Sequence, residues 1–384
     1  MDGLAFDLGM VMLEPHSTPA DPCHDLQTYD PKKLYDWTRF GHLASDWLNN
    51  QVALRRVSTP TCQVDGKIGP DFLLSNRLDV FSKAGLSGPP NIDPHSPLHA
   101  RNKLSDGAYD RATYAQAADW NHGTDVQKKY FEPFVRKVTC QQSNQLLARQ
   151  HRALWVPLYY PETMTSALKG APHTLKEYPF WTTDSGCIST WIRDMYAEVV
   201  ASPTANVNTS PISEISHGST GWTVNTNDGA QWNATDTVMS LPMQRCSQLL
   251  GVAPHDISNR ISISIFLCSI AAEKIRWDSG CHMIVDEDFA IFRITSPERQ
   301  AGRDSRTLRL VAEASPAVLR QRYPHLDPAA AIREELVSLL QLSDPNDLVI
   351  HKGITAQDAL ALPSHDDIHA ANQYRENLQD HAPG

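Results

Sequence analysis

The spacing of apolar residues in the first half of the chain is mainly helical. Between Asp30 and about Asn49 apolar residues recur at helical intervals, while Asp30 can cap the first turn and Pro31 suits its first position. Residues 58–108 are rich in Pro, Gly, Ser and Asp, which predicts a loop with short helices. Further helices are predicted at about 110–120, 124–135, 162–169 and 186–200.

The second half of the chain changes to the period of two that is typical of β-strands. Residues 221–242 predict a hairpin around the turn Asn227-Asp228-Gly229, followed by a strand at 238–241. Residues 260–270 alternate and then become continuously apolar, as in a strand that is half exposed at one end. We expect strands at about 282–285, 289–294 and 307–313 to join it in an antiparallel sheet, followed by a helix at 327–342 and a last strand at 347–351.

Length and composition indicate a folded globular protein. The chain has 384 residues, enough for two or three domains or for one large α/β unit with an inserted substrate domain. Hydrophobic residues make up 41% and charged residues 20%, which excludes wholesale disorder. No run of about eighteen apolar residues is present, so no membrane span is predicted. The N-terminus also lacks the pattern of a secretory signal, so we expect a cytoplasmic location.

Cysteine usage and charge narrow the class of ligand. The seven cysteines are odd in number, widely spaced and free of any Cys-x-x-Cys motif, which favours reduced core thiols over a disulfide framework or a zinc site. The pair His365 and His369 has the spacing of two ligands on one helix face but no third ligand, so no metal site is predicted. Acidic residues outnumber basic ones, the net charge is -10, and no basic stripe is present. The sequence therefore predicts a small-molecule substrate and no nucleic-acid partner.

Three groups of residues, taken in order, resemble one known superfamily. The first is Phe6-Asp7-Leu8-Gly9; the second is the run 130–137, followed by Pro157-Leu158-Tyr159-Tyr160-Pro161 and by the segment 178–186; the third is the strand and loop 290–298 together with Glu313. Their order and spacing across residues 4–315 resemble the flavin-dependent superfamily of amine oxidases, protoporphyrinogen oxidases and UDP-galactopyranose mutases.

The resemblance implies an α/β (α+β) fold, in which a reduced FAD/NAD(P)-binding-type sheet region accompanies a substrate domain of helices on an antiparallel sheet. Residues 1–30 and 186–255 would form the remnant of the dinucleotide-binding-type domain. The helical part of the substrate domain would be 31–185 and its antiparallel sheet 256–350, with 351–384 as a C-terminal tail.

The chain departs from the superfamily where the cofactor would bind. The Gly-x-Gly-x-x-Gly turn that brings a pyrophosphate to a helix N-terminus is absent from residues 1–30. Met10 and Val11 follow Gly9, where many mutase-type relatives continue with Gly-His, and the chain stops before a glycine-containing strand that would cover the flavin. The resemblance thus implies FAD while its binding motif is absent, either because the chain is a fragment of a flavoprotein or because it is a natural reduction.

A missing first βαβ unit would also expose a sheet edge. Such an edge needs cover from another element or another chain, so we expect a homo-oligomer or a partner subunit there.

Four residues are the catalytic candidates, and the resemblance places them at a substrate cavity bounded by the 157–161 loop and the 290–294 strand. Arg293, on a predicted strand, would need an acidic or phosphate partner, so it either holds an anionic substrate or pairs with Glu298 or Glu313. Tyr159 and Tyr160 can donate a hydrogen bond or relay a proton, although core tyrosines with satisfied hydroxyls are the commoner case. Asp7 is either a base or a turn carboxylate.

The resemblance also assigns the cofactor-binding candidates Asp7, Gly9, Asp184 and Gly186. Asp184 has a structural alternative, favoured by its position, as the cap of the helix that follows it. Arg136 and Lys137 could reach a phosphate or carboxylate, but a solvated helix end is favoured because basic residues prefer the last turn.

The resulting hypothesis is an oxidoreductase-like enzyme of small-molecule biosynthesis, of a secondary metabolite or a sugar, with a degenerate cofactor site. A cofactor-independent isomerase or cyclase that reuses the substrate cavity is the first alternative. A catalytically silent partner subunit is the second.

Overall fold

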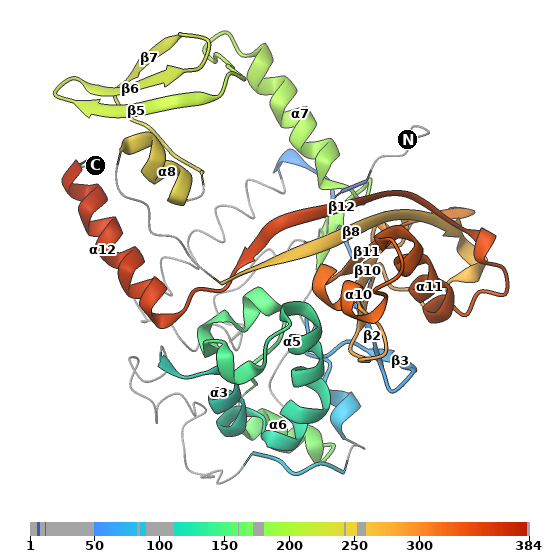
Figure 1. The fold of residues 1–384 in the computed structure, drawn as a ribbon. Coiled ribbons are helices and arrows are strands. Elements are labelled where there is room, and N and C mark those ends of the chain that lie inside the picture. The colour runs from blue at the N-terminus through green and yellow to red at the C-terminus, as the bar shows by residue number, and fades with distance from the viewer. Residues whose placement is uncertain are drawn as a thin grey trace. The chain divides into compact units, whose positions relative to one another are not determined.

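The computed structural model describes residues 6–7, 12, 50–82, 85–89, 111–159, 161–171, 180–241, 243–251 and 259–381. The chain divides into two compact units (Figure 1). The first comprises Met1–Arg193 and Ile261–Leu360, and the second comprises Asp194–Arg260 and Ala361–Gly384. The helix expected at 30–49 lies outside the described residues, and the four-part domain division stays a prediction. No helix among the described residues is long and apolar enough to cross a membrane.

A mixed seven-stranded sheet organises the first unit and confirms the α/β class. Its order is β12-β8-β11-β10-β9-β2-β3, with antiparallel pairing from β8 to β9 and a parallel pairing between β9 and β2. The strands are β2 (Thr61–Val64), β3 (Lys67–Pro70), β8 (Arg260–Ala271), β9 (Cys281–Ile284), β10 (Ile291–Thr295), β11 (Thr307–Ala314) and β12 (Leu348–Ala361). The strands predicted between residues 260 and 313 are all confirmed.

One face of this sheet, here called the aliphatic face, packs against two helices, α10 (Pro316–Arg322) and α11 (Pro328–Leu340). Alternate residues of β8 and β11 point to this side, and Ile332, Leu336 and Leu340 of α11 cover them. The carboxylate of Asp327 accepts hydrogen bonds from the backbone amides of Ala329 and Ala330, so α11 begins where the Asp-Pro signal predicts it.

The opposite face, here called the ion-pair face, carries Arg293, Arg309 and Glu313 together with Cys281 and Met283. Helix α5 (Glu132–Thr139) packs against it, with the ring of Phe134 edge-on to Phe292 at 6.4 Å between centroids. Charged residues are therefore buried on one side of the same strands whose other side is almost wholly apolar.

The helices between residues 78 and 168 form a layer around α5, and the larger ones are the green group in Figure 1. The side chains of Thr113 and Gln116 form a capping box at the start of α3, which confirms the helix predicted at 110–120. Rings of Phe72, Phe81 and Tyr130 meet edge-on in its core. The helices of this layer are α3 (Tyr114–Asn121), α4 (Thr124–Val126), the π-helical turn η4 (Gln127–Phe131) and α6 (Pro161–Leu168), with the short helices η2 (Leu78–Phe81), η5 (Ser143–Gln145), η6 (Ala148–Gln150) and η7 (Arg152–Leu154). The later part of the unit contains α9 (Pro297–Gln300) and the short helices η8 (Ala272–Lys274) and η9 (Pro345–Asp347).

The second unit is small. Strands β5 (Ile212–Gly218), β6 (Gly221–Thr226) and β7 (Gln231–Ala234) form an antiparallel sheet, and the predicted turn at Asn227–Gly229 is confirmed. Helix α7 (Ile188–Ala201) enters this unit from the first, and α8 (Met243–Leu250) and α12 (His365–His381) complete it.

Two secondary-structure expectations are wrong. Residues 238–241 form no strand, and the side chain of Val238 is 97% exposed, so this apolar run has no sheet to join. Strands β2 and β3 replace part of the loop expected at 58–108, because strands of four residues are too short to show a period. The two-stranded pair β1 (Leu54–Arg56) with β4 (Trp181–Thr183) lies where no element was predicted.

The end of the chain also differs from expectation. Strand β12 runs ten residues beyond the expected 347–351, and the 17-residue helix α12 follows it. This part of β12 is a polar, half-exposed strand at the sheet edge, so it lacks the apolar alternation that signals a strand.

Candidate functional site

Asp7 and the start of α7 come together from opposite ends of the first 190 residues. The Asp7 carboxylate accepts hydrogen bonds from the backbone amides of Ile188, at 2.6 Å, and Ser189, at 3.1 Å. This satisfies two amides that a helix N-terminus leaves without partners and places a negative charge at the positive end of the helix dipole. Asp7 is therefore the cap of α7. Of the two roles left open by the sequence, a base or a turn carboxylate, these contacts are of the structural kind.

Asp184 does not cap that helix, contrary to its favoured structural interpretation. Its carboxylate instead pairs with the guanidinium of Arg55, and both side chains are about half exposed. Asp7 takes the cap position instead. It lies about 180 residues away in sequence, so the local sequence pattern around α7 cannot identify it as the cap. Gly9, the fourth cofactor candidate, lies outside the described residues.

Gly186 lies where two backbones meet. Its φ is +70°, and a Cβ at this position would lie 2.0 Å from the carbonyl oxygen of Pro297. Only glycine fits both constraints, since the conformation is left-handed and the space is filled by backbone. The amide of Gly186 donates to the carbonyl of Thr183 at 2.9 Å. This glycine therefore fixes the approach of the loop before α7 to the start of α9.

A buried ion pair adjoins this junction. The guanidinium of Arg309 pairs with the carboxylate of Glu298, which also accepts the backbone amide of Arg309 at 2.9 Å. The ring of Phe6 lies 5.9 Å from the Arg309 guanidinium carbon, and Nη1 of Arg309 is 3.7 Å from Sγ of Cys187. Burial and the negative charge of Asp7 raise the pKa of the Cys187 thiol, so this cysteine is a protonated packing residue rather than a nucleophile.

Arg293 has the carboxylate partner that a buried guanidinium requires. Its Nη2 donates to Oε1 of Glu313 at 2.8 Å, its Nε donates to Oε2, and both side chains are 3% exposed. The guanidinium also stacks on the ring of Trp155, with 4.3 Å from its carbon to the ring centroid. Of the two interpretations, the ion pair with Glu313 is present in the structure. A role toward an anionic substrate stays a prediction.

Tyr159 is fully buried, and its hydroxyl donates to the backbone carbonyl of Phe72. Tyr160 lies outside the described residues. The structure thus brings the segments of Asp7 and Gly186 together at the start of α7, while Tyr159 and Arg293 have partners on other elements, Phe72 and Glu313.

Lys137 corrects the expectation of a solvated helix end. Its ammonium is buried and donates to the backbone carbonyls of Ile284, at 3.0 Å, and of Asp286 and Ile291. Desolvation lowers the pKa of Lys137 to about 7, although the charges of Glu335 and Asp286 act in the other direction. The sequence held a signal, because Lys137 follows Phe134 by three residues and so shares its buried helix face. Arg136 does lie at the surface, paired with Glu287.

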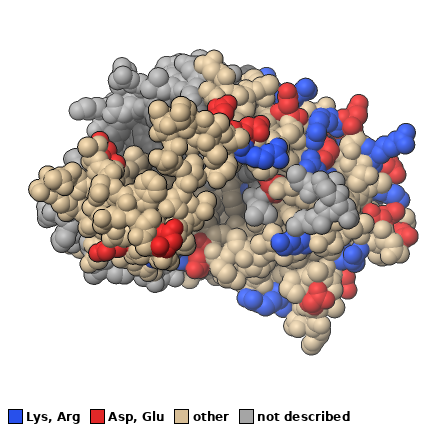
Figure 2. All heavy atoms as spheres, turned by 90° about the horizontal axis from the view of Figure 1, so that it is seen from above, with Lys and Arg blue, Asp and Glu red and all other residues tan. Residues whose placement is uncertain are grey.

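The loop that Lys137 supports also lines an open groove of about 680 Å³ between the β2–β3 turn and the end of α11. Asp286 forms part of its wall and accepts hydrogen bonds from Nε2 of Gln63 and the amide of Gly66. Among the described residues no group of three His, Cys, Asp or Glu side chains could hold a metal ion. Acidic and basic side chains are intermingled on the face of the molecule shown in Figure 2.

The chain matches many solved structures, and two of them illustrate the similarity. Reduced UDP-galactopyranose mutase superposes with a TM-score of 0.56 at 11% identity, over 88% of this chain and 73% of that one. A protein described as a protoporphyrinogen oxidase from Exiguobacterium sp. 255-15 superposes with a TM-score of 0.52 at 14% identity, over 89% and 78%. The chain therefore shares the fold of these two proteins. No family model and no curated protein matches the sequence.

The sequence resemblance implies FAD as the cofactor. The structure shows which contacts the described cofactor candidates make within the chain. The carboxylate oxygens of Asp7 are occupied by two helix amides, the amide of Gly186 by Thr183, and Asp184 by Arg55. The described contacts of these three residues therefore lie within the chain.

Proposed function

We propose that this chain is an oxidoreductase-like enzyme of small-molecule biosynthesis, acting on a secondary metabolite or a sugar. One observation supports the proposal most directly. The segments that carry the sequence resemblance, Phe6-Asp7 and Asp184-Ser185-Gly186, meet at the start of α7 in a chain whose fold is that of a mutase and an oxidase. Fold alone does not determine a reaction. The proposal therefore rests on the finding that the segments with the sequence resemblance are also neighbours in the structure.

In this proposal the described residues hold the helices and loops of the site in place. Asp7 anchors the start of α7, Gly186 holds the preceding loop against α9, and the Arg309–Glu298 pair fixes α9 to β11. FAD, when bound, supplies the electron-transfer chemistry of such enzymes. The substrate that we propose is a small molecule, and Arg293 on its tryptophan platform is the group that would favour an anionic one.

Reconstitution with FAD tests the proposal. Purified protein, incubated with FAD and passed through gel filtration, should retain the flavin absorbance band at roughly 450 nm, a property of the cofactor itself. Gly186→Val should lose this band, because its side chain would collide with Pro297 and displace the loop before α7. The matched control is Gly66→Val, since that glycine also has a positive φ but faces open space.

Failure of the wild-type protein to retain flavin under any condition would contradict the redox assignment. Equal loss in both glycine variants would show a general folding defect. Circular dichroism of each variant separates that outcome from a local one.

A second candidate function is favoured by the internal hydrogen bonding of the predicted cofactor residues. In this proposal the chain is a cofactor-independent isomerase or cyclase, or a catalytically silent subunit that docks a partner along a sheet edge. Turnover without flavin would support the first form, and an oligomer or co-purifying subunit in size-exclusion chromatography would support the second. A stable, inactive monomer would contradict both.

A further inference from the structure

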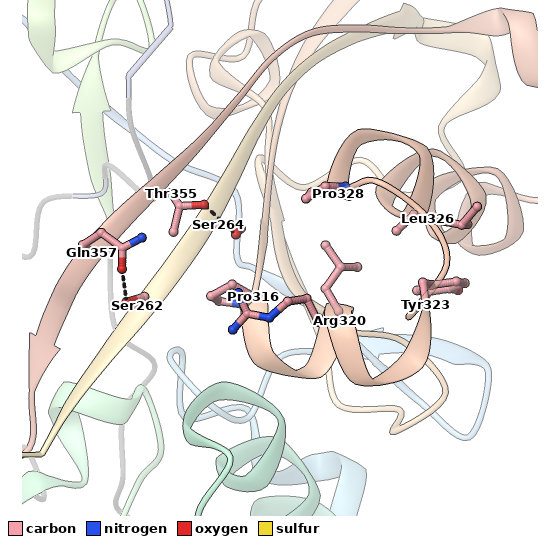
Figure 3. A pocket seen from close by; sticks show the side chains of 11 residues that line it. Ser262, Ser264, Pro316, Arg320, Tyr323, Leu326, Pro328, Thr355 and Gln357 are labelled. Carbon is pink, nitrogen blue, oxygen red and sulfur yellow. Dashed lines mark hydrogen bonds between the residues drawn. The ribbon is translucent and has the colours of Figure 1, made fainter.

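A small cavity outside the junction described above has an unusual lining. It lies between the β8–β12 pair and the turn that joins α10 to α11, and its volume is about 160 Å³ (Figure 3). All of its walls belong to the segment Ile261–Leu360 of the first unit. No acidic residue lines it.

The sheet changes character where it enters this cavity. Along the aliphatic face β8 presents Phe266, Cys268 and Ile270 beneath the helices, but the same row continues as Ser264 and Ser262 in the cavity. Strand β12 matches this change with Thr355 and Gln357. Ser264 is only 3% exposed and Ser262 is half-buried, whereas Thr355 and Gln357 on the edge strand are exposed. The polar row therefore runs from the buried interior, where a hydroxyl in a strand is unusual, to the surface.

The polar groups of this row retain hydrogen-bonding capacity. The hydroxyls of Ser264 and Thr355 lie 3.1 Å apart, and their mutual bond uses only one of their two hydrogens. Ser262 donates to Oε1 of Gln357 at 3.1 Å, which leaves the Gln357 amide nitrogen without a partner among the described residues. Figure 3 shows these two bonds side by side on the strand pair. At least one hydroxyl hydrogen and one amide group can therefore serve a guest.

A single uncompensated cation faces the row. Arg320 of α10 has no carboxylate partner among the described residues, whereas its neighbour Arg322 is 3.7 Å from the Glu335 carboxylate. In Figure 3 the Arg320 side chain extends from α10 past Pro316 toward β8. Leu319, Tyr323 and Leu326 supply apolar walls on the other side. One positive charge, several donors and an apolar wall match a singly charged organic anion.

We propose that this cavity binds a small organic monocarboxylate with a compact apolar body. Arg320 holds the carboxylate at the mouth, the Ser264–Thr355 pair and Gln357 donate to it from the sheet, and the leucines and Tyr323 enclose the apolar part. A cavity of this volume is close to the roughly 150 Å³ that holds one benzene ring, so the guest has the size of a single substituted ring. A guest this small binds with a Kd in roughly the millimolar range.

Benzoate is the probe, and its uncharged analogue benzamide tests the role of charge. Saturation-transfer NMR on the full chain should give saturable benzoate binding that is at least about tenfold tighter than that of benzamide, as expected for loss of a charge-assisted bond. Arg320→Met should weaken benzoate by a similar factor. Arg276→Met is the matched control, because Arg276 is also exposed and lies outside the cavity, so benzoate binding should be unchanged.

Leu326→Trp fills the cavity from its exposed turn and should abolish binding without disturbing the core. Circular dichroism and thermal unfolding verify that each variant is folded. Absence of saturable benzoate binding would overturn the proposal, as would equal binding by Arg320→Met or Leu326→Trp. Binding of inorganic phosphate but not of benzoate would also overturn it, since that result would indicate an ion site without an organic guest. These outcomes are independent of flavin retention.

Discussion

The two faces of the seven-stranded sheet are stabilised in different ways. On the aliphatic face, β8, β10 and β11 present leucine, isoleucine and alanine to α11, and the sheet–helix contact depends on packing. On the ion-pair face the same strands bury Arg293 with Glu313 and Arg309 with Glu298. Apolar contacts tolerate small changes of shape, whereas a buried charge requires its partner. Substitutions on the two faces should therefore lower the free energy of unfolding for different reasons.

The largest expected effect comes from breaking the buried pair on one side. Glu313→Ala leaves the Arg293 guanidinium buried without its carboxylate and should lower the free energy of unfolding by about 4 kcal/mol. The double variant Arg293→Met, Glu313→Leu should recover most of this loss, since neither charge remains. Urea unfolding measures both. The matched control Glu287→Ala breaks an exposed pair and should cost less than about 1 kcal/mol. A double variant as unstable as the single one would contradict this account.

Truncation on the aliphatic face is expected to cost somewhat less. Leu336→Ala removes a fully buried side chain between α11 and the sheet, which should lower the free energy of unfolding by about 3 kcal/mol through lost burial and a residual cavity. Val349→Ala, at a 48% exposed position, is the control and should stay within about 0.5 kcal/mol in the same urea experiment. Comparable losses in the two variants would mean that α11 is not the principal cover of this face.

The aliphatic face also contains a buried histidine, which gives it a pH dependence. His282 is buried beneath Trp277, with ring centroids 4.1 Å apart, and its Nδ1 lies 2.9 Å from the hydroxyl of Thr61. Desolvation lowers the pKa of His282 from 6.5 to about 3. The unfolded chain therefore binds more protons between these values, and stability falls as the pH drops below 6.5.

By about pH 5 the loss from His282 should be on the order of 2 kcal/mol. The measurement is the difference in unfolding free energy between wild type and His282→Leu as a function of pH, which cancels the titration of surface carboxylates. The difference should narrow on acidification. A constant difference from neutral pH to about pH 5 would show that the imidazole is not shielded from water.

The smallest expected effect tests how tightly the aliphatic face is packed. Ile332→Val removes one buried methylene-sized group from α11 and should cost about 1 kcal/mol. Arg293→Lys on the ion-pair face keeps the charge but loses the two-point contact with Glu313, so it should cost more than Ile332→Val does. The reverse order, measured by the same unfolding titration, would remove the proposed distinction between the faces.

The sequence predicts the aliphatic face better than the ion-pair face. The strand at 260–270 and the helix that begins after Asp327 follow from local periods and a local cap, and both are confirmed. Pairing between distant residues has no such local signal. Asp7 as the cap of α7 and Lys137 beneath three carbonyls depend on contacts between segments more than 140 residues apart.

The candidate site was predictable as a set of segments but not as a set of roles. The resemblance singles out residues 6–9 and 184–186, and the structure places Asp7 beside the amides that follow Gly186. The resemblance could not show that the carbonyl of Pro297 requires a glycine at position 186, because the close approach of two backbones leaves no pattern in one sequence. The cavity at Arg320 was missed for a similar reason. Its serines read as the polar half of an ordinary alternating strand.

The buried Lys137 has a consequence for the charge of the whole molecule. The formal net charge of -10 counts this ammonium as fully positive, yet a group with a pKa of about 7 is protonated in only about half of the molecules at neutral pH. Burial beneath the 284–291 loop therefore makes this ammonium much easier to deprotonate than that of a surface lysine. A ligand that binds against this loop and prefers one protonation state will take up or release a fraction of a proton, which calorimetry in buffers of different ionisation heat records directly.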